Sequence, residues 1–195
     1  MAPEALRYDP DPCSIARTLD LIGEKWSLLV LREVFSGVRR FDDLHRRIGV
    51  PRQVLSARLG GLVGAGLLRR HPYQDPGKRT RFEYRLTDAG LDLYPVLVSL
   101  LRWGDRYLDQ PTGGPSVDFT HGDCGEPVDL VLRCRAGHDL ESTRDVKPRP
   151  GPGARLLTPE DPRYDPRVDA EPATEPATEP EPAPAAGIPR PTTRV

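Results

Sequence analysis

Positively charged side chains gather in one stretch of the chain, between residues 39 and 85. This stretch holds 12 Lys and Arg against 4 Asp and Glu, a net charge of +8, whereas the whole 195-residue chain has a formal net charge of −1. A basic block in a nearly neutral chain indicates a surface that binds a polyanion. A basic face that is merely solvated is the alternative.

Two predicted helices position the centre of this block. A short amphipathic helix is expected over residues 41–48, with Asp42 and Asp43 in its first turn. A second helix is expected from Pro51, which suits the first position of a helix, to about residue 63. Two helices joined by so tight a turn form a helix-turn-helix.

A hairpin is expected to follow these helices. Residues 67–71 and 81–86 are predicted to be strands, because apolar and charged residues alternate in the second segment. The intervening loop contains Pro76-Gly77, a strong turn signal. Helices followed by such a hairpin, between residues 19 and 86, predict a winged helix-turn-helix: a mainly α fold with a small β wing.

Three more helices are predicted around this motif. Ser14 is suited to cap a helix that ends near residue 22, and residues 25–35 are apolar enough to form the spine of the core. Thr87 is expected to cap a last long helix that ends near residue 108. Pro95 is expected either to kink this helix or to start its main part. This last helix has more apolar surface than one small domain needs, so a dimer is expected.

The second helix of the motif would present an exposed face to the major groove of DNA. Arg52 and Gln53 lie in its first turn, where Arg suits the O6 and N7 atoms of guanine and Gln suits the edge of adenine. Ser56 and Ala57 come one turn later, and Ala57 suits a thymine methyl group. Arg58 is expected either to meet a phosphate or to brace the fold.

Five further basic residues are predicted to contact the DNA backbone or the adjacent minor groove. Three belong to the hairpin and two precede the first helix of the motif: Lys78, Arg79, Arg81, Arg39 and Arg40. For each arginine the alternative is a solvated charge or an ion pair within the protein.

Several short motifs resemble those of the HxlR-type winged helix-turn-helix transcriptional regulators. The opening signature is Cys-Ser-Ile-Ala-Arg-Thr-Leu-Asp-Leu-Ile-Gly-Glu-Lys-Trp at residues 13–26. Further matches follow in register at residues 31–33, 40–44, 54–59, 66–67 and 83–90 and at Trp103. The resemblance covers about residues 12–108, over half of the chain.

This resemblance implies a bacterial, cytoplasmic, sequence-specific regulator of transcription. Members of the family are homodimers that bind palindromic promoter DNA, and their N-terminal and last helices form the dimer contacts. The partners implied here are therefore double-stranded promoter DNA and a second copy of the chain.

Cys13 stands just before the first predicted helix, where backbone N–H groups and the helix dipole favour a thiolate. Some relatives carry a cysteine at this position that responds to oxidants or electrophiles, so the resemblance also allows a repressor switched through Cys13. The alternative is a small residue at the start of a helix.

Residues 117–141 are predicted to be a small β-rich appendage. His121 and Cys124, followed by Cys134 and His138, have a spacing loosely like that of a zinc site. A segment this short has little core, so a bound Zn²⁺ would stabilise it. An unmetallated hairpin is the alternative, and no other cofactor is expected.

The remaining parts are an N-terminal arm, residues 1–12, and a tail, residues 143–195. The tail holds 13 of the 23 prolines and only one aromatic residue, Tyr164, so it is expected to be disordered. Between them lies the winged-helix DNA-binding and dimerisation domain, residues 13–110.

Other classes of protein fit less well. The chain has no catalytic motif of the serine-hydrolase or phosphate-loop type, and no glycine-rich dinucleotide turn after a strand, so an enzyme is not expected. It has no membrane-spanning apolar run and no signal pattern, and three widely spaced cysteines do not make a disulfide scaffold, which together predict a cytoplasmic protein. A winged helix used for protein–protein contact, or a repressor with a small-molecule ligand, remains open.

Overall fold

The computed structural model describes residues 7–109, 113–115, 117–140 and 142–168. These residues fall into two compact units, each taken by itself below. Residues 18–130 belong to the unit that contains the core, and residues 7–17 and 131–168 belong to the other. No helix in the described part of the chain is both long and apolar enough to cross a membrane.

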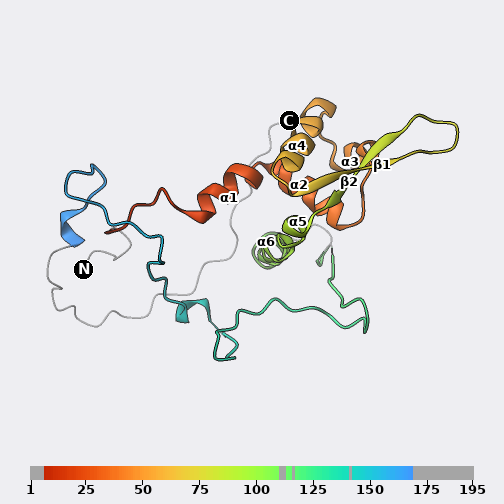
Figure 1. Cartoon of the computed structure of the whole chain (residues 1–195). Coiled ribbons are helices and arrows are strands. Elements are labelled where there is room, and N and C mark those ends of the chain that lie inside the picture. The colour runs from red at the N-terminus through yellow and green to blue at the C-terminus, as the bar shows by residue number, and fades with distance from the viewer. Residues whose placement is uncertain (1–6, 110–112, 116, 141, 169–195) are drawn as a thin grey trace. The chain divides into compact units, whose positions relative to one another are not determined.

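Helix α2 (Lys25–Phe35) is the centre of the core, as the sequence predicts (Figure 1). Val30 and Leu31 are fully buried, with no exposed surface. Helix α1 (Ser14–Ile22) precedes it, and only Ile22 of that helix is buried. Gly23 lies between the two helices. A larger residue would not fit there, because its Cβ would lie 2.5 Å from the carbonyl oxygen of Leu19.

Helices α3 (Phe41–Ile48) and α4 (Arg52–Gly64) form the expected helix-turn-helix. Gly49 between them has a positive φ of 70°, a conformation that glycine adopts without steric cost. Pro51 stands at the N-cap of α4, so the helix begins one residue later than the sequence suggests. Its apolar face is fixed in the core by three side chains that have at most 1% exposure: Leu55, Leu59 and Leu62.

The wing is an antiparallel hairpin of β1 (Leu68–Tyr73) and β2 (Arg81–Leu86) that extends away from the helices (Figure 1). Leu68 pairs with Leu86 at the base of the hairpin. Leu68 and Tyr84 are buried, whereas Phe82 is 51% exposed. The expected alternation therefore holds at the base only, because the outer half of the hairpin has no core to face.

The predicted last helix is divided in two, and of the two roles expected for Pro95 the structure shows the second: it starts the main part of the helix. Helix α5 (Asp88–Leu91) is a single turn capped by Thr87, whose Oγ accepts a hydrogen bond from the backbone N–H of Gly90 at 3.1 Å. Helix α6 (Tyr94–Tyr107) then starts with Pro95 in its first turn. Proline has no backbone N–H to continue the earlier helix, but it is well suited to begin a new one.

Described residues after α6 contain little regular structure. In the core-containing unit, Thr120 forms an isolated β-bridge with Pro127. In the other unit, Arg133 bridges to Asp139, and Tyr8 bridges to Leu156. Two short 3₁₀ turns occur at Thr143–Asp145 and Pro166–Val168. The Pro- and Glu-rich repeat of the predicted tail lies outside the described residues.

Candidate nucleic-acid interface

Asp42 joins the start of α4, the second helix of the helix-turn-helix, to the start of β2 at the outer end of the wing's strands. Arg52, the first residue of α4, donates a hydrogen bond to Oδ1 of Asp42 at 2.8 Å. Arg81, the first residue of β2, lies 3.3 Å from Oδ2 of the same carboxylate. Two predicted DNA-contacting arginines, 29 positions apart in sequence, are therefore held side by side.

This cluster is exposed to water and remains charged. The side chain of Arg52 is 61% exposed and that of Arg81 is 59% exposed. The hydrogen bond from Arg52 holds the pKa of Asp42 below its ordinary value of 3.8. The guanidinium of Arg52 also lies 4.8 Å from the ring centre of Phe41, a cation–π distance. The arginine is thus oriented while its outer face stays accessible.

The rest of the exposed face of α4 is polar and open. Gln53, Ser56 and Ala57 are all exposed. They share the side of the helix that points away from Leu55 and Leu59, which are fully buried. The face predicted to read base edges is therefore free of cover within the described residues.

Arg58 occupies a different environment from the other arginines of α4. Its guanidinium lies 3.6 Å from the carboxylate of Glu24, its side chain is only 35% exposed, and its buried Nε has no hydrogen-bond partner. The sequence left two roles open for Arg58, a phosphate contact and bracing of the fold. The contact with Glu24 favours bracing.

The tip of the wing presents two cations without a protein partner in the described part of the chain. Lys78 and Arg79 are exposed in the turn that contains Gly77, which has a positive φ of 72°. The side-chain amide of Gln74 donates to the carbonyl oxygen of Lys78 at 2.7 Å and stabilises the turn. The turn is therefore held by a side-chain contact to the backbone of Lys78, and the side chains of Lys78 and Arg79 stay available.

Arg39 and Arg40 lie where the chain passes alongside the wing. Tyr84 donates its backbone N–H to the carbonyl oxygen of Arg39 at 2.8 Å. The guanidinium of Arg40 lies 4.2 Å from the ring centre of Tyr73 and 3.2 Å from Asp75. Both arginines are exposed, and Arg40 is in addition fixed to the hairpin by its side chain.

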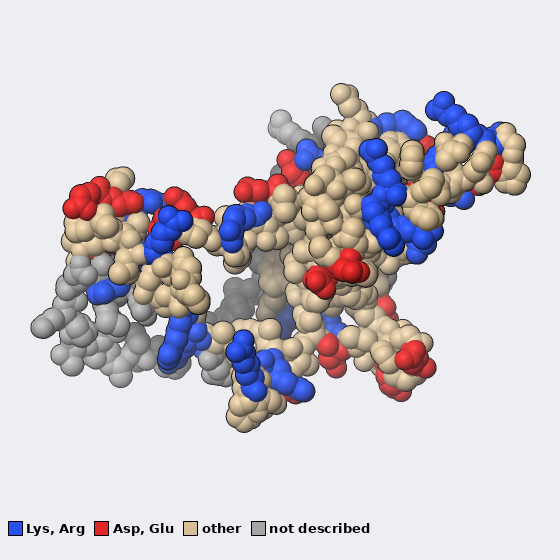
Figure 2. Space-filling view, viewed as in Figure 1, with Lys and Arg blue, Asp and Glu red and all other residues tan. Residues whose placement is uncertain are grey.

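A basic hollow of about 620 Å³ opens beside these residues. Figure 2 shows Lys and Arg side chains gathered over this part of the molecule, around α3 and the hairpin. The wall of this hollow includes Arg46 and Arg47, two arginines that were not among the predicted DNA contacts. The full lining is Gly37, Val38, Arg39, Arg40, Asp43, Arg46, Arg47 and Glu83.

Arg47 also holds a buried carboxylate. Glu33 is only 3% exposed within α2, and it accepts hydrogen bonds from Arg47 and from Arg32, the latter at 2.5 Å from Nη2. Burial alone would raise the pKa of Glu33, but the two arginines outweigh that effect and lower it. The only sequence signal for this site is a glutamate within an apolar helix.

Cys13 is exposed immediately before α1. Its backbone carbonyl accepts the N–H of Arg17 at 3.2 Å, as expected at the start of a helix. A sensing role for this thiol stays a prediction, which DNA binding by the Cys13→Ser variant before and after oxidant treatment would test.

The four predicted metal ligands form two close pairs. Nδ1 of His121 lies 3.2 Å from Sγ of Cys124, and Sγ of Cys134 lies 3.6 Å from Nδ1 of His138. The described residues contain no group of three or more His, Cys, Asp or Glu side chains placed to hold a metal. The zinc site therefore stays a prediction from the sequence, and elemental analysis of the purified protein would test it.

Comparisons with known proteins identify the family of this chain. A family model described as HxlR-like helix-turn-helix matches residues 21–112. Uncharacterised HTH-type transcriptional regulators of Mycobacterium bovis and Mycobacterium tuberculosis are each 50% identical to this chain over 141 residues, 72% of this chain and 87% of theirs.

Two solved structures are also similar. PA1607, a candidate transcription factor, has a TM-score of 0.61 at 36% identity, over 70% of this chain and 94% of that one. PA1374 of Pseudomonas aeruginosa, also a candidate transcription factor, has a TM-score of 0.50 at 34% identity, over 73% and 95%. With the helix-turn-helix and its wing, these matches show that the chain belongs to the HxlR-like helix-turn-helix family of transcriptional regulators, which is not a class of enzymes.

Proposed function

We propose that the protein is a homodimer that recognises specific palindromic sites in promoter DNA. In this proposal α4 enters the major groove and the hairpin of β1 and β2 follows the flanking backbone. The observation that carries the proposal is the shared carboxylate of Asp42, which brings Arg52 of α4 and Arg81 of the wing together.

The charges on each element suit different parts of the duplex. Arg52 and Gln53 extend from the first turn of α4, the part of a recognition helix that reaches base edges. Lys78 and Arg79 extend from the tip of a hairpin, where they suit phosphates and carry no sequence information of their own. Sequence preference is thus assigned to α4 and general affinity to the wing.

The dimer is supported by apolar side chains that a single chain leaves in water. In α1, Ile15 is 71% exposed and Leu19 is 53% exposed. In α6, Trp103 is 48% exposed and Tyr107 is 43% exposed. Apolar surface of this kind on two helices favours burial against a second copy. A two-fold dimer would then read a palindromic site.

Binding measurements on two arginine variants test the docking. Arg52→Ala is expected to cost about 1–3 kcal/mol on a selected site and to relax the sequence preference. Arg79→Ala is expected to weaken binding equally on all duplexes and to reduce the dependence of affinity on salt. Fluorescence anisotropy with selected and random duplexes, at several salt concentrations, measures both effects.

Arg133→Ala is the matched control, because it removes the same charge outside the helix-turn-helix, the wing and α6, where Arg133 contacts Asp139 at 2.5 Å. It should bind DNA as the unmodified protein does. If Arg52→Ala and Arg79→Ala both bind as tightly as this control, the proposed docking is wrong. A winged helix used only for protein contacts would show no salt-dependent binding to random duplex DNA.

A further inference from the structure

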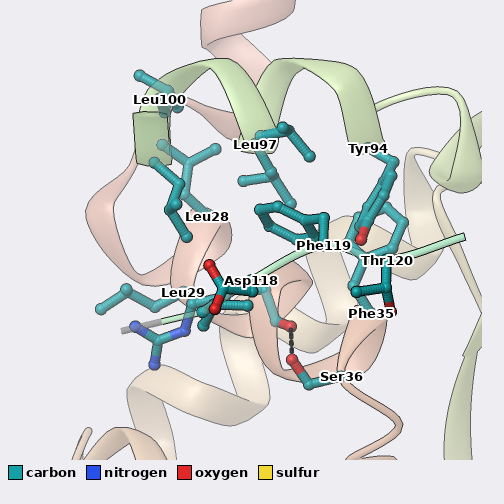
Figure 3. Close-up of a pocket in the computed structure, with 14 residues that line it drawn as sticks. Leu28, Leu29, Phe35, Ser36, Tyr94, Leu97, Leu100, Asp118, Phe119 and Thr120 are labelled. Carbon is teal, nitrogen blue, oxygen red and sulfur yellow. Dashed lines mark hydrogen bonds between the residues drawn. The ribbon is translucent and has the colours of Figure 1, made fainter. Parts of the chain in front are cut away.

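An apolar cavity of about 550 Å³ lies on the side of α2 that faces α6. Figure 3 shows its lining side chains, which come from α2, from α6 and from residues 117–120. Leu28 and Leu29 belong to α2, and Leu97 and Leu100 belong to α6. A volume of this size is typical of sites for small organic ligands.

The third wall of the cavity is held in place by specific contacts. Val128 donates its backbone N–H to the carbonyl oxygen of Phe119 at 2.8 Å, and Thr120 bridges to Pro127. Arg102 of α6 donates a hydrogen bond to the carbonyl oxygen of Val128. The strand-like segment of residues 117–120 is thus attached to α6, and the cavity is more than a gap between two helices.

One end of the cavity is aromatic. The rings of Phe35 and Tyr94 have centroids 4.9 Å apart, and Phe119 meets Tyr94 edge-on at 5.7 Å. Rings packed in this way offer further faces and edges to an aromatic guest. The aromatic end therefore favours a ligand that itself contains rings.

Among the residues that line the cavity, Asp118 has the one acidic side chain. Asp118 is exposed and has no partner among the described residues. Ser36 donates its hydroxyl hydrogen to the carbonyl oxygen of Arg32 at 3.1 Å, which leaves its oxygen free to accept. The guanidinium of Arg32 is itself held by Glu33 at 2.5 Å. An N–H group on a ligand would therefore find an acceptor in the carboxylate of Asp118.

We propose that this cavity binds an apolar, ring-containing small molecule with an N–H donor, that is, an aromatic amine. The rings would lie among the leucines and beside Phe35 and Tyr94, and the N–H group would face Asp118. Occupation would change DNA affinity, because α2 lines the cavity on one side and packs against α4 on another. This second step rests on the proposed DNA binding, whereas the ligand site does not.

A fluorescence titration of the full chain tests the ligand site. N-phenyl-1-naphthylamine is the probe, since it has two aromatic groups, one N–H and an emission that rises in apolar surroundings. It is expected to bind saturably, with one molecule per chain. Leu97→Phe fills the cavity and should weaken binding about tenfold or more. Val96→Phe is the matched control on the same helix, since Val96 is outside the lining and 44% exposed.

The role of Asp118 is tested by a second pair of measurements. Asp118→Ala should weaken binding of the amine probe severalfold. It should leave unchanged the affinity of 1-phenylnaphthalene, which lacks the N–H and is measured by its displacement of the probe. Equal effects of Leu97→Phe and Val96→Phe would overturn the site. Failure of the unmodified protein to bind the probe would also overturn it.

DNA binding with and without the probe separates the two proposals. A saturating probe is expected to change the affinity of the unmodified protein for a selected duplex, but not that of Leu97→Phe. DNA binding that ignores a bound probe would overturn the regulatory step and leave the proposed function intact. A protein that binds the probe but no DNA would overturn the proposed function and leave the ligand site intact.

Discussion

Asp42 shows how one side chain can organise a binding surface and also oppose the ligand. Its carboxylate orients Arg52 and Arg81, yet it places a negative charge where phosphates are expected. Because both arginines are more than half exposed, these ion pairs contribute little to stability. In the proposed docking, Asp42 therefore tunes DNA binding more than it holds the fold.

Asp42→Asn should raise the affinity for random duplex DNA several-fold, because one repulsive charge is lost and two arginines are released. It should also reduce the preference for a selected site, since Arg52 is no longer oriented. Asp43→Asn is the matched control, because Asp43 pairs only with Arg46 of its own helix, at 2.8 Å, among the described ion pairs. Equal gains for both variants would show that Asp42 contributes charge alone.

At the scale of elements, Glu33 connects α2 to α3. Its carboxylate lies in the core and is shared by Arg32 of its own helix and Arg47 of α3. A buried carboxylate is costly unless it is paired, and both partners here keep contact with water. The contact therefore fixes the first helix of the motif on the core at a small net cost.

The pKa of Glu33 predicts how stability depends on pH. Burial raises this pKa, but the two arginines lower it by a larger amount. The folded pKa of Glu33 therefore lies below the ordinary 4.5. Its stabilisation is thus complete above that value and is lost as the pH falls through the lower, folded pKa. Glu33→Gln should lose about 1–2 kcal/mol at neutral pH. Urea unfolding between neutral and acidic pH should show a smaller acid loss for the variant than for the unmodified protein.

The contact between α5 and the wing depends on a glycine. A Cβ on Gly90 would lie 2.2 Å from the carbonyl oxygen of Leu67, just before β1. Gly90→Ala should therefore cost about 1–3 kcal/mol, because backbone must move. Gly104→Ala is the control, since its Cβ would meet nothing closer than 3.8 Å. It should stabilise α6 by about 0.5–1 kcal/mol. Thermal unfolding at equal protein concentration measures both, and equal shifts would contradict the prediction.

At the scale of the whole molecule, the proposed dimer depends on α1, of which a single chain buries only Ile22. Leu19→Asp should produce monomers and weaken binding to a palindromic duplex more than to a half-site, because the two recognition helices are no longer linked. Sedimentation velocity and anisotropy measure the two effects. Leu156→Asp, at a residue 64% exposed and outside both helices, is the control. A Leu19→Asp protein that remains dimeric would place the interface elsewhere.

Much of the fold could be predicted from local sequence patterns. The apolar spacing of residues 25–35 and 41–48 gave the bounds of α2 and α3 as the structure has them. Helical periodicity, caps and turn residues act over a few positions, so they can be read without knowledge of the fold. Predictions became weaker where the core ends, as at Phe82, because alternation alone does not say where burial stops.

The sequence by itself determined that this chain has a winged helix-turn-helix, a basic face and the motifs of its family, because these depend on residue type and local spacing. Only the tertiary structure decided that Asp42 joins Arg52 to Arg81, that Arg47 pairs with Glu33, and that α2 and α6 leave an apolar cavity. These features join residues far apart in the chain. Their contacts arise from how whole elements pack, which no local pattern encodes.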